Sequence, residues 1–246
     1  MELGDPLLPT VRDPSAAIIF AGGQRLGGRQ HQEDYWINFN DECFAVADGV
    51  GGMPHGGMAA QLSAETAIWG YKHIRSRRFY WQDKKLFLKR IFRSANIAVW
   101  QKRRETGFEQ GLAATLVVAI IGPKNFWVGS VGDSAAYLVR HGVATKLTVD
   151  DLDEAGLLTS VVGTNRYGLV PQVVSERFLP GDTLLLSTDG VSKYVPEGSL
   201  ASLLAASGDT TASLTQAAQL LLDAAQEAGS SDNLTACLIK KVVRGR

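Results

Sequence analysis

Residues 113–147 read AATLVVAIIGPKNFWVGSVGDSAAYLVRHGVATKL, and this stretch decides the fold. It contains apolar runs of strand length that are separated by short turn-forming sequences, which is typical of strands joined by tight turns. The runs are 113–121, 126–131, 135–139 and 143–147, and the turns contain Gly122-Pro123, Gly132-Asp133 and His141-Gly142. Residues 113–147 therefore predict a meander of antiparallel strands.

On either side of this stretch, strands are again grouped with strands and helices with helices. Further buried strands are predicted from apolar runs at Ala16–Phe20, Cys43–Ala47, Val173–Phe178, Thr183–Ser187 and Leu234–Ile239. Apolar residues at steps of three and four predict helices over 60–74, from an N-cap at Asp83 to 98, over 200–205 and over 214–225. This grouping argues against a regular alternation of strand and helix and favours an α+β fold, with antiparallel sheets and helices layered outside.

The length and composition are those of one folded domain. The chain has 246 residues, of which 45% are hydrophobic and 20% are charged, and this is the ordinary range for a globular protein. Residues 1–15 contain three prolines and few periodic apolar positions, so we expect a leader or a loosely packed strand there. We expect residues 16–243 to form a single domain.

Charge and cysteine usage exclude several classes of protein. The 25 basic and 25 acidic side chains cancel, so no overall field draws the chain to nucleic acid or to an anionic membrane. No apolar stretch approaches the roughly 20 residues of a membrane span, and no basic segment leads into an apolar one near Met1. Cys43 and Cys237 make neither a disulfide framework nor a zinc site. We expect a cytoplasmic protein that is not secreted and does not span a membrane.

Aspartates stand beside several of the predicted strands, each next to Gly, Ser or Asn. They are Asp48, Asp133, Asp189 and Asp232. Asp-Gly is also the signature of a tight hairpin, and this reading stays open at Asp189 because 191–195 could be a return strand. At Asp48 the glycine-rich segment 49–57 opens a helix instead. Carboxylates that converge from strand ends can bind hard divalent cations, and a pair of such ions can activate a water for attack on phosphorus.

The order of these motifs is similar to that of the metal-dependent protein phosphatases, the type 2C or PPM family. The resemblance runs from about Gly22 to Ile239. The segments that carry it are Arg29-x-x-x-Glu33-Asp34, Asp48-Gly-x-Gly-Gly52, Gly111-x-x-x-Thr115, Gly132-Asp-Ser134, Leu147-Thr-x-Asp150, Asp189-Gly190 and Asp232-Asn233. It implies a central antiparallel β-sandwich flanked on both sides by helix pairs, a four-layer arrangement with the metal centre at one end.

The resemblance also implies roles for individual residues. Asp48 would bridge two Mn²⁺ or Mg²⁺ ions, Gly49 would offer its carbonyl, and Asp189 and Asp232 would complete the ligands of one ion. Glu33 and Asp34 would act from nearby through water bound to the metal. Asp133 would hold a third ion together with Asp189, as in many bacterial members. Arg29 would grip the substrate phosphate, for which a planar guanidinium is well suited.

The implied activity is hydrolysis of phosphoserine and phosphothreonine in proteins by in-line attack of a water activated at the dinuclear centre. The expected partners are phosphorylated proteins, in particular those of an opposing Ser/Thr kinase, and the chain is expected to be a monomer. A pseudophosphatase that binds phosphoproteins without turnover is the alternative, but it would be expected to lose a principal acid. A dinucleotide site is disfavoured because Pro54 stands where the third glycine of that fingerprint belongs.

Two departures from the family pattern concern the leaving group and the flap. Met53 stands where bacterial relatives usually place His. His55 lies two residues further on, and we expect it to be a solvent-exposed loop histidine rather than the acid that protonates the leaving alkoxide. The segment between Asp150 and Gly163 is too short for the longer flap that is common in the family, so we expect a more open cleft.

Overall fold

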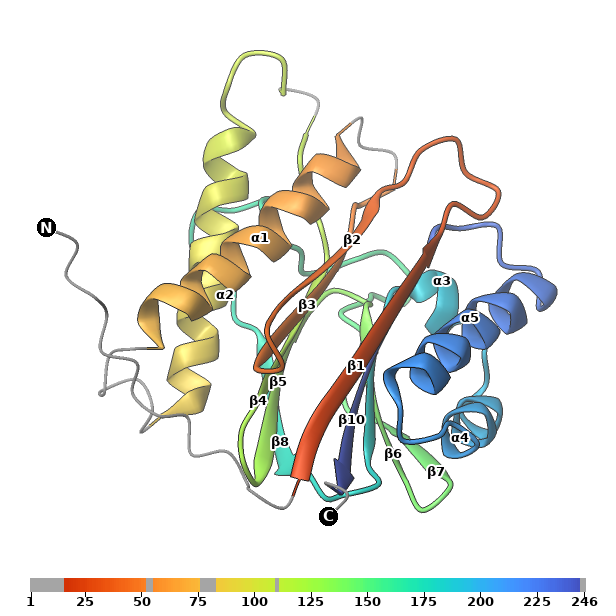
Figure 1. The fold of residues 1–246 in the computed structure, drawn as a ribbon. Coiled ribbons are helices and arrows are strands. Elements are labelled where there is room, and N and C mark those ends of the chain that lie inside the picture. Colours follow the sequence, from red (N-terminus) through yellow and green to blue (C-terminus); the bar gives the residue numbers. More distant parts are fainter. Residues whose placement is uncertain (1–15, 52–54, 76–82, 109–110, 244–246) are drawn as a thin grey trace, which may run out of the picture.

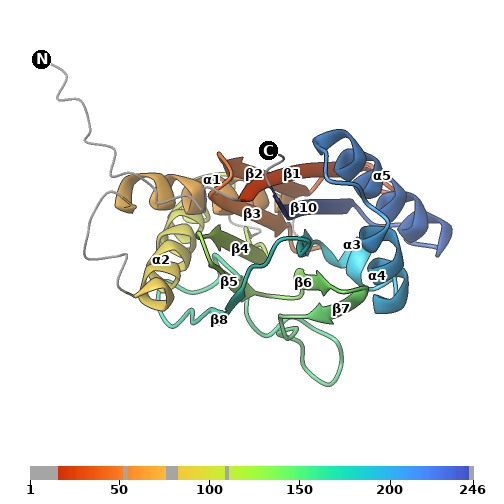
Figure 2. The same ribbon diagram turned by 60° about the horizontal axis from the view of Figure 1, so that its bottom comes forward.

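The computed structural model describes residues 16–51, 55–75, 83–108 and 111–243, so the leader predicted at 1–15 lies outside the described residues. Two five-stranded antiparallel sheets pack face to face, and helices cover the outer face of each sheet (Figure 1, Figure 2). The layers therefore run helices, sheet, sheet, helices. This confirms the predicted α+β sandwich with helices on both sides.

The two sheets have the strand orders β2-β3-β4-β5-β8 and β1-β10-β9-β6-β7. The strands of the first sheet are β2 (Asp34–Phe39), β3 (Cys43–Asp48), β4 (Leu116–Ile121), β5 (Asn125–Val131) and β8 (Gln172–Arg177). Those of the second are β1 (Ala16–Arg25), β10 (Leu234–Val243), β9 (Thr183–Ser187), β6 (Ala135–Arg140) and β7 (Val143–Lys146). Helices α1 (Gly56–Ile74) and α2 (Lys84–Lys102) cover the first sheet, and α3 (Asp189–Ser192), α4 (Glu197–Ala205) and α5 (Thr211–Glu227) lie on the second.

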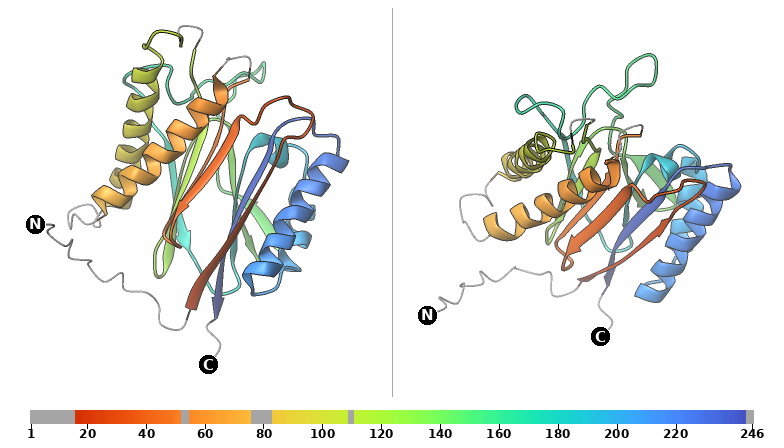
Figure 3. Two further views of the ribbon diagram at one scale, coloured as in Figure 1. Left: turned by 45° about the horizontal axis from the view of Figure 1, so that its top comes forward. Right: turned by 90° about the horizontal axis from the view of Figure 1, so that it is seen from above.

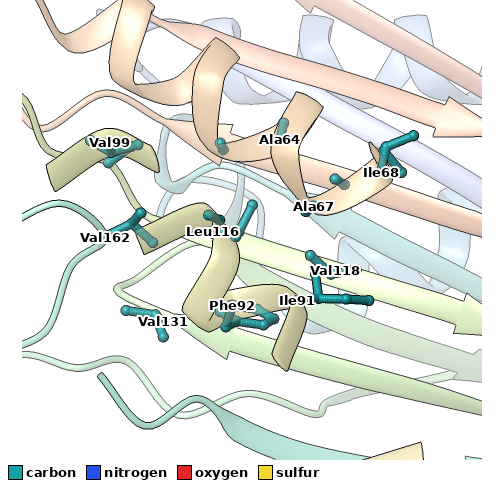
Figure 4. Close-up of a cluster of buried hydrophobic side chains, with 14 of the residues drawn as sticks. Ala64, Ala67, Ile68, Ile91, Phe92, Val99, Leu116, Val118, Val131 and Val162 are labelled. Atoms are coloured by element: carbon teal, nitrogen blue, oxygen red, sulfur yellow. The ribbon is translucent and has the colours of Figure 1, made fainter. Parts of the chain in front are cut away.

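Three hydrophobic clusters correspond to the three contacts between these layers. Strand β3 shows how one sequence serves two of them, because its side chains alternate between faces. Phe44 and Val46 pack between the sheets, whereas Ala45 and Ala47 pack under the helices. Figure 4 shows the cluster under the helices, where Ile91 and Phe92 of α2 lie close to strands β4 and β5. Both faces of the central strands are buried, which explains their nearly continuous apolar sequence.

The predicted helices are confirmed, and so is the N-cap at Asp83, whose side chain accepts a hydrogen bond of 3.0 Å from the Leu86 N–H. The meander is only partly right. Strands β4 and β5 belong to the first sheet and β6 and β7 to the second, so the chain changes sheet at Gly132-Asp133. Gly132 has a φ of +94°, a conformation that favours glycine and lets the chain turn out of the first sheet.

Strand β2 was not expected, and β1 is longer than predicted. No strand was predicted between Phe20 and Cys43, but Gly22, Gly23 and Gln24 continue β1 and pair along β10. A Cβ added to Gly22 would lie 2.3 Å from the ring of Trp36. The glycine therefore makes room for a Trp side chain of β2 that packs against the cluster between the sheets.

Candidate active site

Several strand ends meet at one end of the sandwich, the upper end in Figure 1 and the end that faces the viewer on the right of Figure 3. Asp34 begins β2 directly opposite Asp48, the last residue of β3. Asp189 follows β9, and Asp232 precedes β10. Asp133 lies where the chain passes from β5 to β6. The fold thus gathers at one end the aspartates that the sequence places far apart.

Asp48 is fixed through its backbone by Thr115. Its N–H donates to Thr115 Oγ1 at 3.0 Å, and its carbonyl accepts from the Thr115 N–H at 2.8 Å. The same hydroxyl lies 2.6 Å from Ser134 Oγ. Because Ser134 follows Asp133, these bonds connect the backbone of Asp48 to the segment that carries a second candidate acid.

Asp34 is held under the site by two threonines. Its Oδ2 accepts hydrogen bonds from Thr188 Oγ1 at 2.8 Å and from Thr235 Oγ1 at 2.7 Å. The other oxygen, Oδ1, is buried without a hydrogen-bond partner. Burial raises the pKa of Asp34 to about 7, although the threonine hydrogen bonds act in the opposite direction. Asp34 is therefore a buried acid with one free oxygen.

Asp189 and Asp133 share one cation. Lys193 Nζ lies 2.7 Å from Asp189 Oδ2 and 2.8 Å from Asp133 Oδ2. Burial raises the pKa of Asp133, and its hydrogen bond to Lys193 opposes this effect. Asp189 Oδ1 has no hydrogen-bond partner. The hairpin reading of Asp189 is wrong, because helix α3 begins at this residue.

The loop between β1 and β2 carries Arg29 and Glu33, and Asn233 anchors it. Asn233 Oδ1 accepts from the Glu33 N–H at 2.8 Å, while its Nδ2 donates to the carbonyls of Leu26 and His31 at 2.9 and 3.1 Å. Arg29 Nη2 donates to Asp232 Oδ2 at 2.8 Å, and the Arg29 side chain is 47% exposed. The guanidinium is thus bound at the rim of the acidic cluster and remains accessible.

The site contains more negative than positive charge. Its acidic residues are Glu33, Asp34, Asp48, Asp133, Asp189 and Asp232, and the cations bound to them are Arg29 and Lys193. Burial raises the pKa of Asp48 well above its ordinary value, and the charges of Asp34, Asp189 and Asp232 add to this effect. Further positive charge at the site would favour the ionised form of Asp48.

Oxygen ligands of this kind fit hard divalent cations. Within residues 16–51, 55–75, 83–108 and 111–243, no three His, Cys, Asp or Glu side chains already form a group that could hold a metal ion. Arg29 and Lys193 instead bind three of the carboxylates. The two buried oxygens without partners, Asp34 Oδ1 and Asp189 Oδ1, are the observation that favours a cation here, because a buried carboxylate oxygen normally has a partner.

Gly49 and His55 lie where the chain passes from β3 into α1. A Cβ added to Gly49 would lie 2.2 Å from the backbone carbon of Gly56, so glycine permits this close approach. His55 Nε2 lies 3.1 Å from the Gly107 carbonyl, and its ring packs edge-to-face on Phe108. His55 is a loop residue of intermediate exposure, and its contact with Gly107 lies at the surface, so the expectation of a solvent-exposed loop histidine is partly confirmed. Met53 lies outside the described residues.

Residues 24–238 match the family model described as Protein phosphatase 2C. The chain belongs to this family. It is 25% identical over 235 residues to the serine/threonine phosphatase stp of Listeria monocytogenes, an alignment that covers 87% of this chain and 91% of that protein.

Solved structures agree with this assignment in fold. The serine/threonine phosphatase PstP/Ppp of Mycobacterium tuberculosis is 22% identical, with a TM-score of 0.77 over 92% of this chain and 99% of that one. The catalytic domain of a PstP in complex with 2 manganese ions is 24% identical, with a TM-score of 0.77 over 93% of this chain and 100% of that one. The four-layer sandwich is thus a known phosphatase architecture.

Several residues of the site had no role in the sequence analysis. Thr115 and Asn233 stand within the family motifs, so their spacing could have indicated their hydrogen bonds. Lys193 could have been found from its position four residues after Asp189 at the start of a helix. Thr235 gives no sequence signal, because its contact with Asp34 spans 201 residues.

Proposed function

We propose that this chain is a metal-dependent Ser/Thr protein phosphatase, with residues 16–243 as one catalytic domain. The observation that carries the proposal is the cluster of carboxylates at one end of the sandwich, where negative charge exceeds positive charge and two buried oxygens have no partner. Membership of the protein phosphatase 2C family indicates that the reaction at this cluster is phosphate hydrolysis.

The residues that would hold the ions are those at the strand ends. We infer that Asp48, Asp189 and Asp232 would hold two Mn²⁺ or Mg²⁺ ions through their carboxylates, together with the backbone carbonyl of Gly49. Glu33 would contribute from the β1–β2 loop. Bound divalent ions activate a water and neutralise the oxygens of a transferring phosphoryl group.

The chain's own groups orient the substrate and hold protons. Arg29 is charged at any relevant pH, accessible, and already bound to the Asp232 carboxylate. Its guanidinium can therefore release Asp232 and bind the phosphate group of a substrate instead. Asp34 lies directly opposite Asp48, with Oδ1 free to accept a proton and Oδ2 held by Thr188 and Thr235. The two threonines keep this acid in place by hydrogen bonding.

Phosphoproteins are the substrate class, and we infer that they are products of an opposing Ser/Thr kinase.

Both cysteines are free and buried, which fits a reducing, cytoplasmic location. No helix among the described residues has the length and apolar character needed to cross a membrane. We further infer a monomer that binds no nucleic acid.

A phosphothreonine peptide and p-nitrophenyl phosphate test this function. Phosphate release should depend on Mn²⁺ or Mg²⁺ and stop on addition of a chelator, and Asp232→Ala should abolish it. Asp223→Ala, which removes a surface carboxylate of α5 paired with Arg25, is the matched control and should retain activity. Phosphate release that continues unchanged in the presence of the chelator would overturn the proposal. Peptide binding without turnover would favour a pseudophosphatase.

A further inference from the structure

Lys193 stands one helical turn after Asp189, and this spacing directs its side chain back to the site. Helix α3 spans only Asp189–Ser192, and the Lys193 N–H closes the turn on the Asp189 carbonyl at 3.0 Å. Residues four apart on a helix lie on the same face. The ammonium consequently reaches the Asp189 carboxylate at 2.7 Å.

The same ammonium reaches a second carboxylate from a different part of the chain. Asp133 lies 60 residues before Lys193, and Nζ is 2.8 Å from its Oδ2. The Asp133 side chain is only 7% exposed, whereas the Lys193 side chain is 46% exposed. The lysine thus approaches from the solvent side and places its charge on a buried carboxylate, where an unpaired charge would be costly.

The two oxygens of Asp189 have different surroundings. Oδ2 binds Lys193, while Oδ1 is buried without a hydrogen-bond partner, and Asp189 acts electrostatically on Asp48. One oxygen is therefore available for an ion beside Asp48 while the other stays on the lysine. A cation held by Asp133 and Asp189 together would have to displace the ammonium.

We propose that Lys193 is a built-in counter-ion that occupies the cation position between Asp133 and Asp189, so that this centre takes two divalent ions and excludes a third. The inference rests on the proposed function, since it presumes two ions near Asp48. It replaces the expectation that Asp133 ligates a third ion: Asp133 instead positions Lys193.

The test counts Mn²⁺ ions on the full chain by isothermal calorimetry and by native mass spectrometry. Wild type should bind two. Lys193→Met keeps the length of the side chain and removes its charge, and it should bind one more ion of weaker affinity. The double variant Lys193→Met/Asp133→Asn should return to two.

Lys146→Met is the matched control, because Lys146 also binds an aspartate four residues away, Asp150, at 2.7 Å, and no second carboxylate among the described residues forms a salt bridge with it. It should bind two ions, as wild type does. Thermal unfolding shows whether each variant is folded. Without metal, Lys193→Met should melt below wild type because Asp133 and Asp189 then repel each other, and Mn²⁺ should remove most of that difference.

Each outcome of the count decides the inference. Three ions on wild type, with the third lost in Asp133→Asn, would show that lysine does not exclude a third cation. Two ions on both wild type and folded Lys193→Met would overturn this inference alone and leave the proposed phosphatase intact. A wild-type chain that binds no Mn²⁺ would overturn both.

Discussion

The two ends of the sandwich differ in how completely their buried charged groups are paired. At the end away from the candidate site, Asp182 is 2% exposed and receives two hydrogen bonds from Arg140, at 2.9 and 2.6 Å, and one from the Leu179 N–H at 2.7 Å. Lys240 donates to the Ser207 carbonyl at 2.6 Å. Both of these buried charges are paired with groups of the chain itself.

At the site end the acids outnumber the cations, and two buried carboxylate oxygens have no partner. A fold selected only for stability would pair or remove such groups, because a buried polar atom without a partner costs about 1–3 kcal/mol. This contrast indicates that the site end binds cations that the chain itself does not supply. The predictions for Asp48 and Asp182 test whether the two ends differ in this way.

The largest effect is expected from Asp48→Asn. Removing the carboxylate that would be shared by the ions should lower turnover of a phosphothreonine peptide by about 10²–10³-fold or more. The same change should raise the melting temperature of the metal-free chain, because burial and the charges of Asp34 and Asp189 disfavour the ionised form of Asp48. Steady-state kinetics and calorimetry measure the two effects. A variant that is both fully active and less stable would contradict the role of Asp48.

At the opposite end, Asp182→Ala should produce the reverse pattern. It leaves the Arg140 guanidinium without its carboxylate and the Leu179 N–H without its acceptor, so the free energy of unfolding should fall by about 2–3 kcal/mol. Urea denaturation measures the loss. Activity per folded molecule should stay at the wild-type level, and a selective loss of turnover would show that the two ends are coupled.

A smaller loss of stability is expected from Thr188→Val, which removes one of the two hydroxyls that hold Asp34. Thr188 Oγ1 donates to Asp34 Oδ2 and accepts from the Thr235 N–H at 3.2 Å. The loss should be about 1–2 kcal/mol in urea denaturation, with a lower kcat, because Asp34 is then less firmly oriented. Unchanged kcat with reduced stability would limit Thr188 to a structural role.

A pH-dependent effect on stability is expected from Lys84, a buried ammonium 5.7 Å from the ring centre of Trp127. Burial lowers the pKa of Lys84 to about 8, so folding disfavours its charged form. Stability should accordingly rise as the pH increases from about 8 toward the unfolded-state value near 10.5. Lys84→Met should remove this rise, which melting curves at pH 7 to 10 can measure. An equal slope in both proteins would contradict the lowered pKa.

Much of the fold could be predicted from local pattern. Turn residues and apolar runs located most strands, and the spacing of apolar residues located both long helices. The transfer of the chain between sheets at Gly132-Asp133 could not be predicted, because strands buried on both faces read alike in either sheet. Strand β2 was missed because the glycines before it resemble a loop, whereas Gly22 makes space for Trp36.

The site was predictable where its residues stand at strand ends within recognisable motifs, as Asp48, Asp189 and Asp232 do. The structure brings these acids to one end of the molecule, as expected. The groups that complete their surroundings depend on contacts between distant segments. Lys193 meets Asp133 across 60 residues, and Thr235 meets Asp34 across 201. Such contacts follow from sheet order and register, which single-sequence patterns do not fix.

The most direct measurement is the melting temperature of wild type, Asp48→Asn and Asp182→Ala with Mn²⁺ and with a chelator. At Mn²⁺ about 100-fold above its Kd, binding adds about 2.7 kcal/mol, which corresponds to roughly 5–10 °C for a chain of this size. We predict this rise in wild type and in Asp182→Ala and its loss in Asp48→Asn. No rise in wild type, or the same rise in Asp48→Asn, would contradict a site end built to bind divalent cations.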